Sequence, residues 1–280
     1  MKIIICLLMV LGSQLSFAEE VKILSWNVFM LPKPLKFSKQ VERTVMITAE
    51  LKKLDHDVIV LEEAFMESFR DSVASTLKET YPYQQELGRS GSITQVMTSG
   101  VYILSRIPFQ VLGHSYYKEC GKADCYASKG VLLLQFPKFQ LAATHLQSGQ
   151  TIRIKKIRAT QLVQIRDLLL KHKTEKMPQL LVGDLNINAL KGDEYLEAQK
   201  FLGMTSAPLG GGEVSSSSNN INCYDPRTQV RTKWIDHMFE APHGSEMKLL
   251  SKTLVILKGK FDDKTCDLSD HHAIEGKFSL

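Results

Sequence analysis

The sequence predicts an α/β sandwich with mixed β-sheets, and three observations support that fold class. Nine short apolar runs have the length and composition of strands, and some are separated only by turn residues. Two longer segments, residues 40–54 and 152–173, carry apolar residues at helical spacing. No linker or internal repeat divides residues 19–280, so one large domain is expected. The strand-like runs are residues 21–29, 57–65, 99–106, 130–136, 139–147, 179–187, 232–240, 252–257 and 272–280.

The first 18 residues have the pattern of a secretory signal peptide. Lys2 precedes an apolar stretch, residues 3–11, and small residues at Ser16 and Ala18 fit cleavage after Ala18. The stretch is too short to span a bilayer, and no later segment is apolar for long enough. We therefore expect export, with a mature chain of residues 19–280 that is secreted or periplasmic and has no transmembrane segment.

The charge of the chain does not identify a partner. The formal net charge is +5, which is mild for 280 residues and excludes neither an anionic surface nor a neutral one. Basic residues of segment 152–173 lie opposite its apolar face. We expect them to form a solvated helix surface rather than a membrane or nucleic-acid patch.

The cysteines predict disulfides. Cys6 would leave with the signal peptide, and the other four form an even set in an exported chain, which allows three pairings. Their spacing does not fit a zinc site. The preferred pairing is Cys120 with Cys125 and Cys223 with Cys266.

Six strand-like runs end in carboxylate, amide or imidazole side chains. Taken alone, each group is more typical of a turn or a cap; Asp184 and Asn186, for example, would close an Asx turn. Alternation along an extended chain would instead point these two side chains in the same direction, past the end of the sheet. Turn chemistry does not explain an apolar strand before every polar end, so we expect one shared site. The groups are Asn27, Glu62 with Glu63, His145 with Gln147, Asp184 with Asn186, Asp236, and Asp270 with His271.

If these groups converge, they form a site rich in oxygen ligands. Such a site suits Mg²⁺ or a similar hard cation, and it has the imidazole and carboxylate groups that phosphoester hydrolysis requires.

The ordered motifs WN, E, H, GDLN, ID and SDH, from residue 26 to 271, resemble the endonuclease/exonuclease/phosphatase superfamily. Within it, the sequence is most similar to the bacterial sphingomyelinase C branch. The resemblance implies a four-layered sandwich, in which two packed mixed β-sheets are flanked by helices and the site lies at one edge. The local matches are EEAF at 62–65, SGVYILSRIPF at 99–109, ADCYASKGV at 123–131, THLQ at 144–147 and CYDPRTQ at 223–229.

The resemblance also implies roles for single residues. Glu63 would be the principal ligand of Mg²⁺, or of Mn²⁺ or Co²⁺, with Asn27 and Asp270 near the metal or its waters. The catalytic groups would be five. Asp184 would orient and deprotonate the attacking water, Asn186 would hold that water or a phosphoryl oxygen, His271 would donate charge or a proton, Asp236 would fix the tautomer of His271, and His145 would bind the phosphoryl group.

The expected reaction is hydrolysis of sphingomyelin, or a related phosphocholine lipid at a membrane surface, to ceramide and phosphocholine by a monomer. Two alternatives stay open: a secreted Mg²⁺-dependent nuclease that uses the basic helix of residues 153–173, and a non-catalytic relative that binds lipid or a partner. Nucleic acid is the less expected substrate. Residues 258–272 are charged and contain only one aromatic residue, Phe261, where sphingomyelinases generally carry an aromatic hairpin, so an interfacial anchor there would be weak.

Four other features carry smaller expectations. Asp124 and Lys129 either form a salt bridge that closes their loop or contact the lipid headgroup. His237 and His272 are expected to have structural or surface roles. The low-complexity segment 209–222 is expected to be a mobile surface loop.

Overall fold

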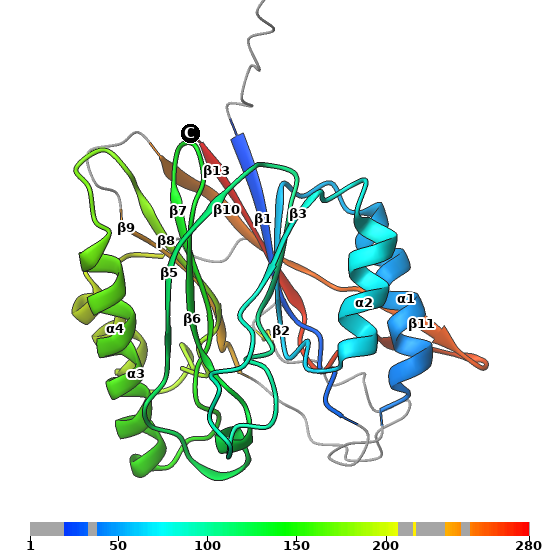
Figure 1. Ribbon diagram of the computed structural model, residues 1–280, viewed down its shortest axis with the longest axis horizontal. Helices are drawn as coiled ribbons and strands as arrows, with labels where there is room; N and C mark the ends of the chain where they lie inside the picture. Colours follow the sequence, from blue (N-terminus) through cyan, green and yellow to red (C-terminus); the bar gives the residue numbers. More distant parts are fainter. Residues whose placement is uncertain (1–19, 33–37, 207–214, 217–232, 242–246, 280) are drawn as a thin grey trace, which may run out of the picture.

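The protein is a four-layer sandwich in the order helices, sheet, sheet, helices (Figure 1). The computed structural model describes residues 20–32, 38–206, 215–216, 233–241 and 247–279. The predicted fold class is therefore confirmed, together with the layers that the family resemblance implied.

The first sheet has six strands and is mixed. They are β1 (Glu20–Asn27), β2 (Val58–Glu62), β3 (Tyr83–Glu86), β4 (Tyr102–Ser105), β10 (Lys248–Val255) and β13 (Ala273–Ser279). Their order in the sheet is β10-β13-β1-β2-β4-β3. β1 and β2 are parallel, whereas the other neighbours are antiparallel.

The second sheet has five strands in the order of the sequence. They are β5 (Gln110–Tyr116), β6 (Gly130–Gln135), β7 (Gln140–His145), β8 (Gln179–Asp184) and β9 (Asp236–Ala241). Only β7 and β8 are parallel neighbours. All six residues of β8 are buried, as expected for a strand that is covered on both faces.

In the part of the chain that the structure describes, four helices cover the outer faces of the sheets (Figure 1). α1 (Gln40–Lys53) and α2 (Glu67–Leu77) pack on the first sheet, and α3 (Ile152–Lys171) and α4 (Glu194–Leu202) pack on the second. Thr151 precedes α3 as its N-cap, because its side chain accepts a hydrogen bond from Ile154 N. The remaining elements are a short 3₁₀ helix, η1 (Lys122–Tyr126), and a hairpin of β11 (Lys258–Phe261) and β12 (Lys264–Asp267).

Alternate residues of the central strands fill different cores. In β8, Leu180 and Val182 lie in the core between the two sheets, and Leu181 packs in the core under α3 and α4. Period-two alternation requires this arrangement, because successive side chains of a strand point to opposite faces. Both sheets are thus anchored on two sides, which holds their edges in fixed relative positions.

Cys120 and Cys125 form a disulfide, as predicted. Cys266 is also disulfide-bonded, and its predicted partner, Cys223, lies outside the described residues. Most of segment 209–222 lies outside them as well. Among the described residues, no helix is long and apolar enough to span a membrane.

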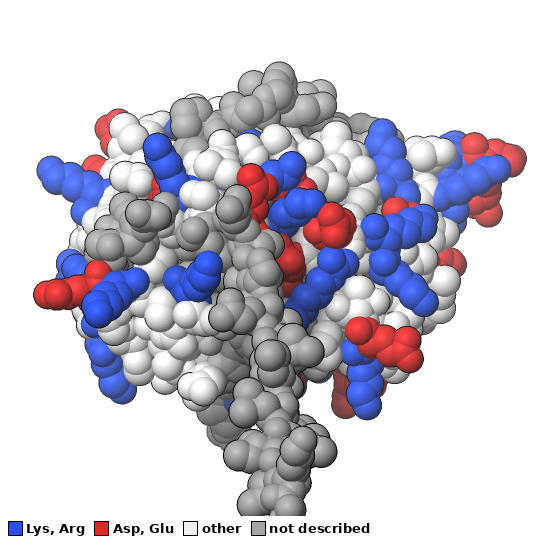
Figure 2. Space-filling model, turned by 90° about the horizontal axis from the view of Figure 1, so that it is seen from above, with Lys and Arg blue, Asp and Glu red and all other residues white. Residues whose placement is uncertain are grey.

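The face from which β1 begins carries interspersed charges. In Figure 2, Lys and Arg side chains lie next to Asp and Glu side chains over the described part of that face. One such group joins Lys22 Nζ to Asp55 at 2.7 Å and Arg106 to the same carboxylate at 3.1 Å. This surface offers no broad basic patch in the part of the chain that the structure describes.

Candidate active site

The predicted site residues converge where β1, β2, β7 and β8 end, at the lower edge of the sheets in Figure 1. In the second sheet His145 pairs with Asp184, and Asp184 pairs with Asp236, so three polar residues form a row across the strands. In the first sheet Asn27 and Glu62 are the last pair of β1 and β2. The strand register therefore accounts for most of the convergence.

Asp184 lies at the centre of the site and uses its two oxygens differently. Oδ1 accepts a hydrogen bond from Asn186 N at 2.9 Å, which forms the Asx turn expected if Asp184 and Asn186 are considered alone. Oδ2 accepts from Asn27 Nδ2 at 3.1 Å and lies 3.4 Å from His145 Nε2. The turn and the site are thus compatible. Burial, and next the charge of Asp236, raise the pKa of Asp184 to about 6.

His271 is held by Asp236. Its Nδ1 lies 3.0 and 2.9 Å from the two carboxylate oxygens, and its Nε2 lies 3.9 Å from Asp184 Oδ2. Trp26 Nε1 donates to the backbone oxygen of His271 at 3.0 Å, which fixes the residue against the first sheet. Burial alone would lower the pKa of His271, but the charge of Asp236 raises it well above the usual range. The imidazole is therefore positively charged at neutral pH.

His145 lies on the other side of Asp184, next to a buried lysine. Lys129 Nζ is 3.1 Å from His145 Nε2 and 2.9 Å from Asp124 Oδ2. The loop-closing salt bridge between Asp124 and Lys129 is therefore present, and it reaches the site. Burial and then the charge of Lys129 lower the pKa of His145 well below its usual range, so this imidazole is neutral.

Asn186 follows β8 and contacts the chain just after β7. Its Nδ2 donates to Leu146 O at 3.2 Å, and its backbone has a left-handed φ of 53°. Glu63 (φ 54°) and Phe29 (φ 52°) adopt the same rare conformation just after β2 and β1. Non-glycine residues in this region are strained, and such strain is concentrated at functional sites.

Glu62 and Glu63 point in different directions, as expected for adjacent residues at the end of a strand. Glu62 is fully buried and accepts from Ser25 Oγ at 2.8 Å; burial, and next Asp236, raise its pKa well above the usual range. Glu63 turns toward the site, with Oε1 4.0 Å from His145 Nε2. Burial, followed by the charge of Asp270, raises the pKa of Glu63 to about 7. Glu63 and Asp270 therefore lie close enough to repel each other.

These residues fit a divalent cation. Glu63, Asp184, Asp236 and Asp270 are acidic, whereas among the described residues of the site only two groups, Lys129 and His271, supply positive charge. Glu63 Oε2 is buried without a hydrogen-bond partner in the described part of the chain. Oxygen ligands of this kind suit Mg²⁺ or a similar cation.

A second grouping could also hold a metal. Ligand atoms of Asp184, Asp236 and His271 all lie within 4.8 Å of one another. Asp236 is already engaged with His271 Nδ1 through both oxygens, however. Glu63 Oε2, by contrast, has no hydrogen-bond partner in the described part of the chain, so the carboxylate of Glu63 is the less satisfied one and the better suited to accept a cation.

Sequence reasoning missed the supporting role of one residue, Arg158. Arg158 was expected on a solvated face of α3, but it is fully buried, donates to Gln147 O and Gly149 O, and pairs with Glu194 at 2.7 Å. It fixes the loop that follows His145. No pattern marks it, because a lone arginine on a basic helix is normally solvated.

The two histidines outside the predicted site have structural contacts. His237 is buried, and its Nε2 lies 2.7 Å from Ile187 O. His272 follows the hairpin of β11 and β12, and its Nε2 lies 3.3 Å from Oδ2 of Asp267, the last residue of β12. Both contacts agree with the roles expected for them.

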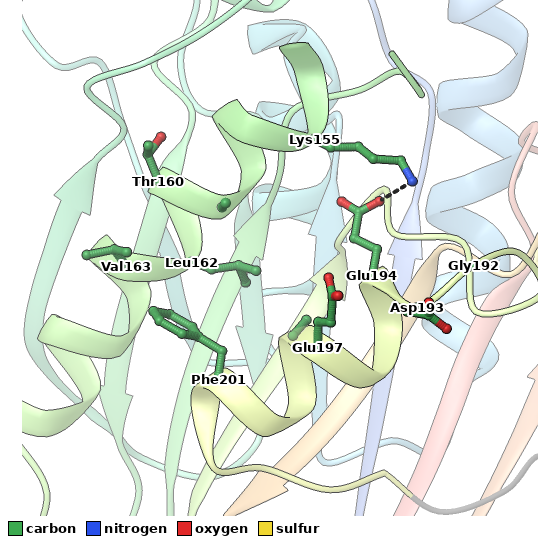
Figure 3. Close-up of a pocket in the computed structure, with 11 residues that line it drawn as sticks. Lys155, Thr160, Leu162, Val163, Gly192, Asp193, Glu194, Glu197 and Phe201 are labelled. Carbon is green, nitrogen blue, oxygen red and sulfur yellow. Dashed lines mark ion pairs between the residues drawn. The ribbon is translucent and has the colours of Figure 1, made fainter. Parts of the chain in front are cut away.

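The groove of Figure 3 lies away from these groups. It has a volume of about 700 Å³ between α3 and α4, and Leu162, Val163 and Phe201 are among the residues that line it. Lys155 and Glu194, which form an ion pair at 3.7 Å, belong to its wall. None of the predicted catalytic residues contributes to the lining, so this groove is separate from the candidate site.

Comparisons with known proteins agree with the geometry. The endonuclease/exonuclease/phosphatase family model matches residues 24–271. The chain is 28% identical to a "Sphingomyelinase C 2" of Leptospira interrogans over 92% of this chain and 46% of the relative. It is also 28% identical to a phospholipase C of Staphylococcus aureus, over 91% of this chain and 86% of the relative. The chain thus spans about half of the first relative and most of the second.

A solved structure extends the comparison to the fold. A variant of beta toxin from Staphylococcus aureus, crystallised with bound magnesium ions, superposes with a TM-score of 0.80 at 26% identity, over 92% of this chain and 99% of that one. The chain therefore belongs to the endonuclease/exonuclease/phosphatase family, and its sequence and fold are similar to those of the bacterial sphingomyelinases C.

Proposed function

We propose that this chain is an exported, metal-dependent phosphodiesterase that hydrolyses sphingomyelin to ceramide and phosphocholine by attack of water on phosphorus. The observation that carries the proposal is the pair of Asp184 and His271, a buried carboxylate and a charged imidazole 3.9 Å apart. Two such groups can serve as base and acid for displacement at a phosphate. The names of the relatives supply the substrate class.

Asp184 would act as the base toward the attacking water. With a pKa of about 6 the carboxylate is mostly ionised at neutral pH and still accepts a proton readily. The Asx turn to Asn186 and the amide of Asn27 fix its orientation. The amide oxygen of Asn186 would help to hold the water.

His271 would donate its Nε2 proton to the oxygen that leaves phosphorus. Asp236 holds Nδ1, so the proton that is transferred must be the one on Nε2, which faces Asp184. His145 would bind the phosphoryl group on the other side of Asp184, and the ammonium group of Lys129, 3.1 Å from His145 Nε2, would add positive charge there.

A divalent cation would be held by Glu63, with Asn27 and Asp270 near it or its waters. When bound, it would neutralise charge that develops on the phosphate and the leaving oxygen. Glu63 and Asp270 would lose their mutual repulsion on binding it.

The test is an assay of the purified mature chain, residues 19–280, which we propose to be a single catalytic domain. Phosphocholine release from detergent-dispersed sphingomyelin should require Mg²⁺ and cease with a chelator. Asp184→Asn should reduce kcat by about a hundredfold or more. The matched control, Asp167→Asn on the exposed surface of α3, should leave the rate unchanged.

Two outcomes would contradict the proposal. Cleavage of plasmid DNA without release of phosphocholine would assign the site to a nuclease. Lipid binding without any turnover, in the wild type as in Asp184→Asn, would indicate a non-catalytic relative. Export would be checked by N-terminal sequencing of protein recovered from the medium or periplasm, which should begin at Glu19.

A further inference from the structure

Three large apolar side chains are exposed at the end of the molecule that carries the candidate site. Ile93 is 92% exposed, Val96 is 60% exposed and Tyr126 is 55% exposed. They belong to two loops that lie where β1 and β7 end (Figure 1). Single exposed apolar residues are common, whereas several beside a site indicate a contact surface.

The two loops are joined by backbone contacts. Met97 and Ala127 form a parallel bridge, and Met97 N donates to Tyr126 O at 3.0 Å. Val96 and Tyr126 each precede a residue of this bridge, so the two exposed residues lie on adjoining parts of the two loops. Ile93 extends the exposed group from the turn just before Val96.

This apolar group is connected directly to the site. Lys129 follows Tyr126 by three residues and reaches His145 Nε2 at 3.1 Å. Asp124, in η1, accepts from Lys129 Nζ at 2.9 Å and from Ser148 N at 2.8 Å. A surface that touches Tyr126 would therefore lie beside the groups proposed to bind phosphate.

The charges around the apolar group favour a phosphate-bearing surface. Residues 88–98 contain one cation, Arg89, and no acidic residue. On the second loop Lys118, Lys122 and one acidic residue, Glu119, are exposed, and Asp124 is neutralised by Lys129, so the exposed charge of this loop is positive. Apolar tips with cations behind them match hydrocarbon that is covered by a layer of lipid phosphates.

The hairpin of β11 and β12 does not provide such a contact. Phe261, its only aromatic residue, is 5% exposed and packs in the core under α1 and α2. The exposed tip carries Asp262 and Asp263, whose charges are unfavourable in a bilayer.

We infer that Ile93, Val96 and Tyr126 form a docking surface for a bilayer of phosphocholine lipids, which places the candidate site against the headgroups. The inference rests on the proposed function, because the substrate of that reaction lies in such a bilayer. It assigns this end of the molecule to lipid rather than to a protein partner.

The experiment measures binding and turnover separately. Vesicles of phosphatidylcholine and sphingomyelin are sedimented with the chain in the Asp184→Asn background, so that substrate is not consumed. The double variant Ile93→Ser/Val96→Ser should raise the lipid concentration for half-maximal binding at least about tenfold, because two apolar side chains no longer enter the bilayer. With Asp184 restored, its rate on detergent-dispersed sphingomyelin should be unchanged.

Two further variants make the comparison specific. Tyr126→Ser tests the second loop and should also raise the lipid concentration for half-maximal binding. Val111→Ser is the matched control, since Val111 is 47% exposed and pairs with Leu134 at the far end of β6, away from the site. It should bind vesicles as the unsubstituted chain does.

Each contrary result overturns the inference. Vesicle binding that is insensitive to both loop changes, equal weakening by Val111→Ser, or loss of activity on dispersed substrate in a loop variant would do so. Vesicle binding that depends on the loops, in a chain that releases no phosphocholine, would support the docking surface and reject the proposed function. Melting temperatures of all variants confirm that they are folded.

Discussion

Asp236 is the residue on which the charge of His271 depends. Without its carboxylate, burial still lowers the pKa of the imidazole and only the charges of Asp184 and Asp270 raise it, so the pKa of His271 should fall. Asp236→Asn keeps the shape of the side chain and should lower kcat by about a hundredfold to ten-thousandfold. The rate is measured on detergent-dispersed sphingomyelin, and the pKa of His271 is followed by NMR.

The control for this change is Asp263→Asn at the exposed tip of the hairpin, which should affect neither quantity. An Asp236→Asn variant that retains the wild-type rate while the pKa of His271 falls would show that the charged imidazole is not required. The assignment of His271 as the proton donor would then be wrong.

At the residue scale, the sequence indicated which side chains meet but not how they are oriented. The alternation argument for Asp184 and Asn186 omitted the left-handed backbone at Asn186, which depends on the Asx turn to Asp184. Lys129 was recognised as a candidate for two roles, but its contact with His145 depends on how the loop after Cys125 folds. Such contacts are fixed by tertiary packing and cannot be read from spacing.

Gly183 is required by the pairing of β7 and β8. A Cβ at this position would lie 1.9 Å from Thr144 O, and the φ of 144° is unfavourable for other residues. Gly183→Ala should therefore lower the free energy of unfolding by about 3 kcal/mol or more. Because His145 and Asp184 are the next pair along these strands, any folded fraction should also have lost activity.

Gly192→Ala provides the comparison for this prediction. Its φ is 71°, but a Cβ there meets nothing within 4 Å, so only the backbone cost of about 1–2 kcal/mol applies. Both variants are measured by chemical denaturation. Equal losses of stability would mean that the β7–β8 strands separate easily and do not fix the site.

At the element scale, strong periodic segments were predictable and weak ones were not. Five apolar residues recur at helical spacing in segment 152–173, and all five are buried in α3: Ile154, Ile157, Leu162, Ile165 and Leu169. α2 was missed because only Phe69, Val73 and Leu77 form its apolar stripe. β5 was missed because it is an edge strand whose residues are all at least partly exposed, so it lacks the apolar run that marked the other strands.

The whole molecule brings negative charge from both sheets into one buried region. Packing the two sheets together buries Asp184 and Asp236 and leaves the side chain of Glu63 only 18% exposed beside them. The order and identity of the sequence motifs were sufficient to predict that these acidic groups lie close together. Their pKa shifts could not be predicted, because the shifts depend on how deeply each group is buried once the sheets pack.

Glu63 should therefore destabilise the metal-free protein above its own pKa. The folded pKa is about 7, above the usual 4.5, so between these values the folded state binds more protons than the unfolded state. Stability must then fall as pH rises through this window, by about 1–3 kcal/mol once the carboxyl is fully ionised. Glu63→Gln removes this cost and should be the more stable protein at pH 8 in chelator, with little difference below pH 4.5.

Mg²⁺ should reverse the order, because a cation that binds only the folded state stabilises the wild type by mass action and finds a weaker ligand set in Glu63→Gln. Denaturation curves at pH 8 with chelator and with Mg²⁺ measure both effects. Glu197→Gln, on the exposed surface of α4, is the control and should respond to neither condition. A Glu63→Gln variant that is less stable than wild type in chelator at pH 8 would mean that the carboxylate is structural.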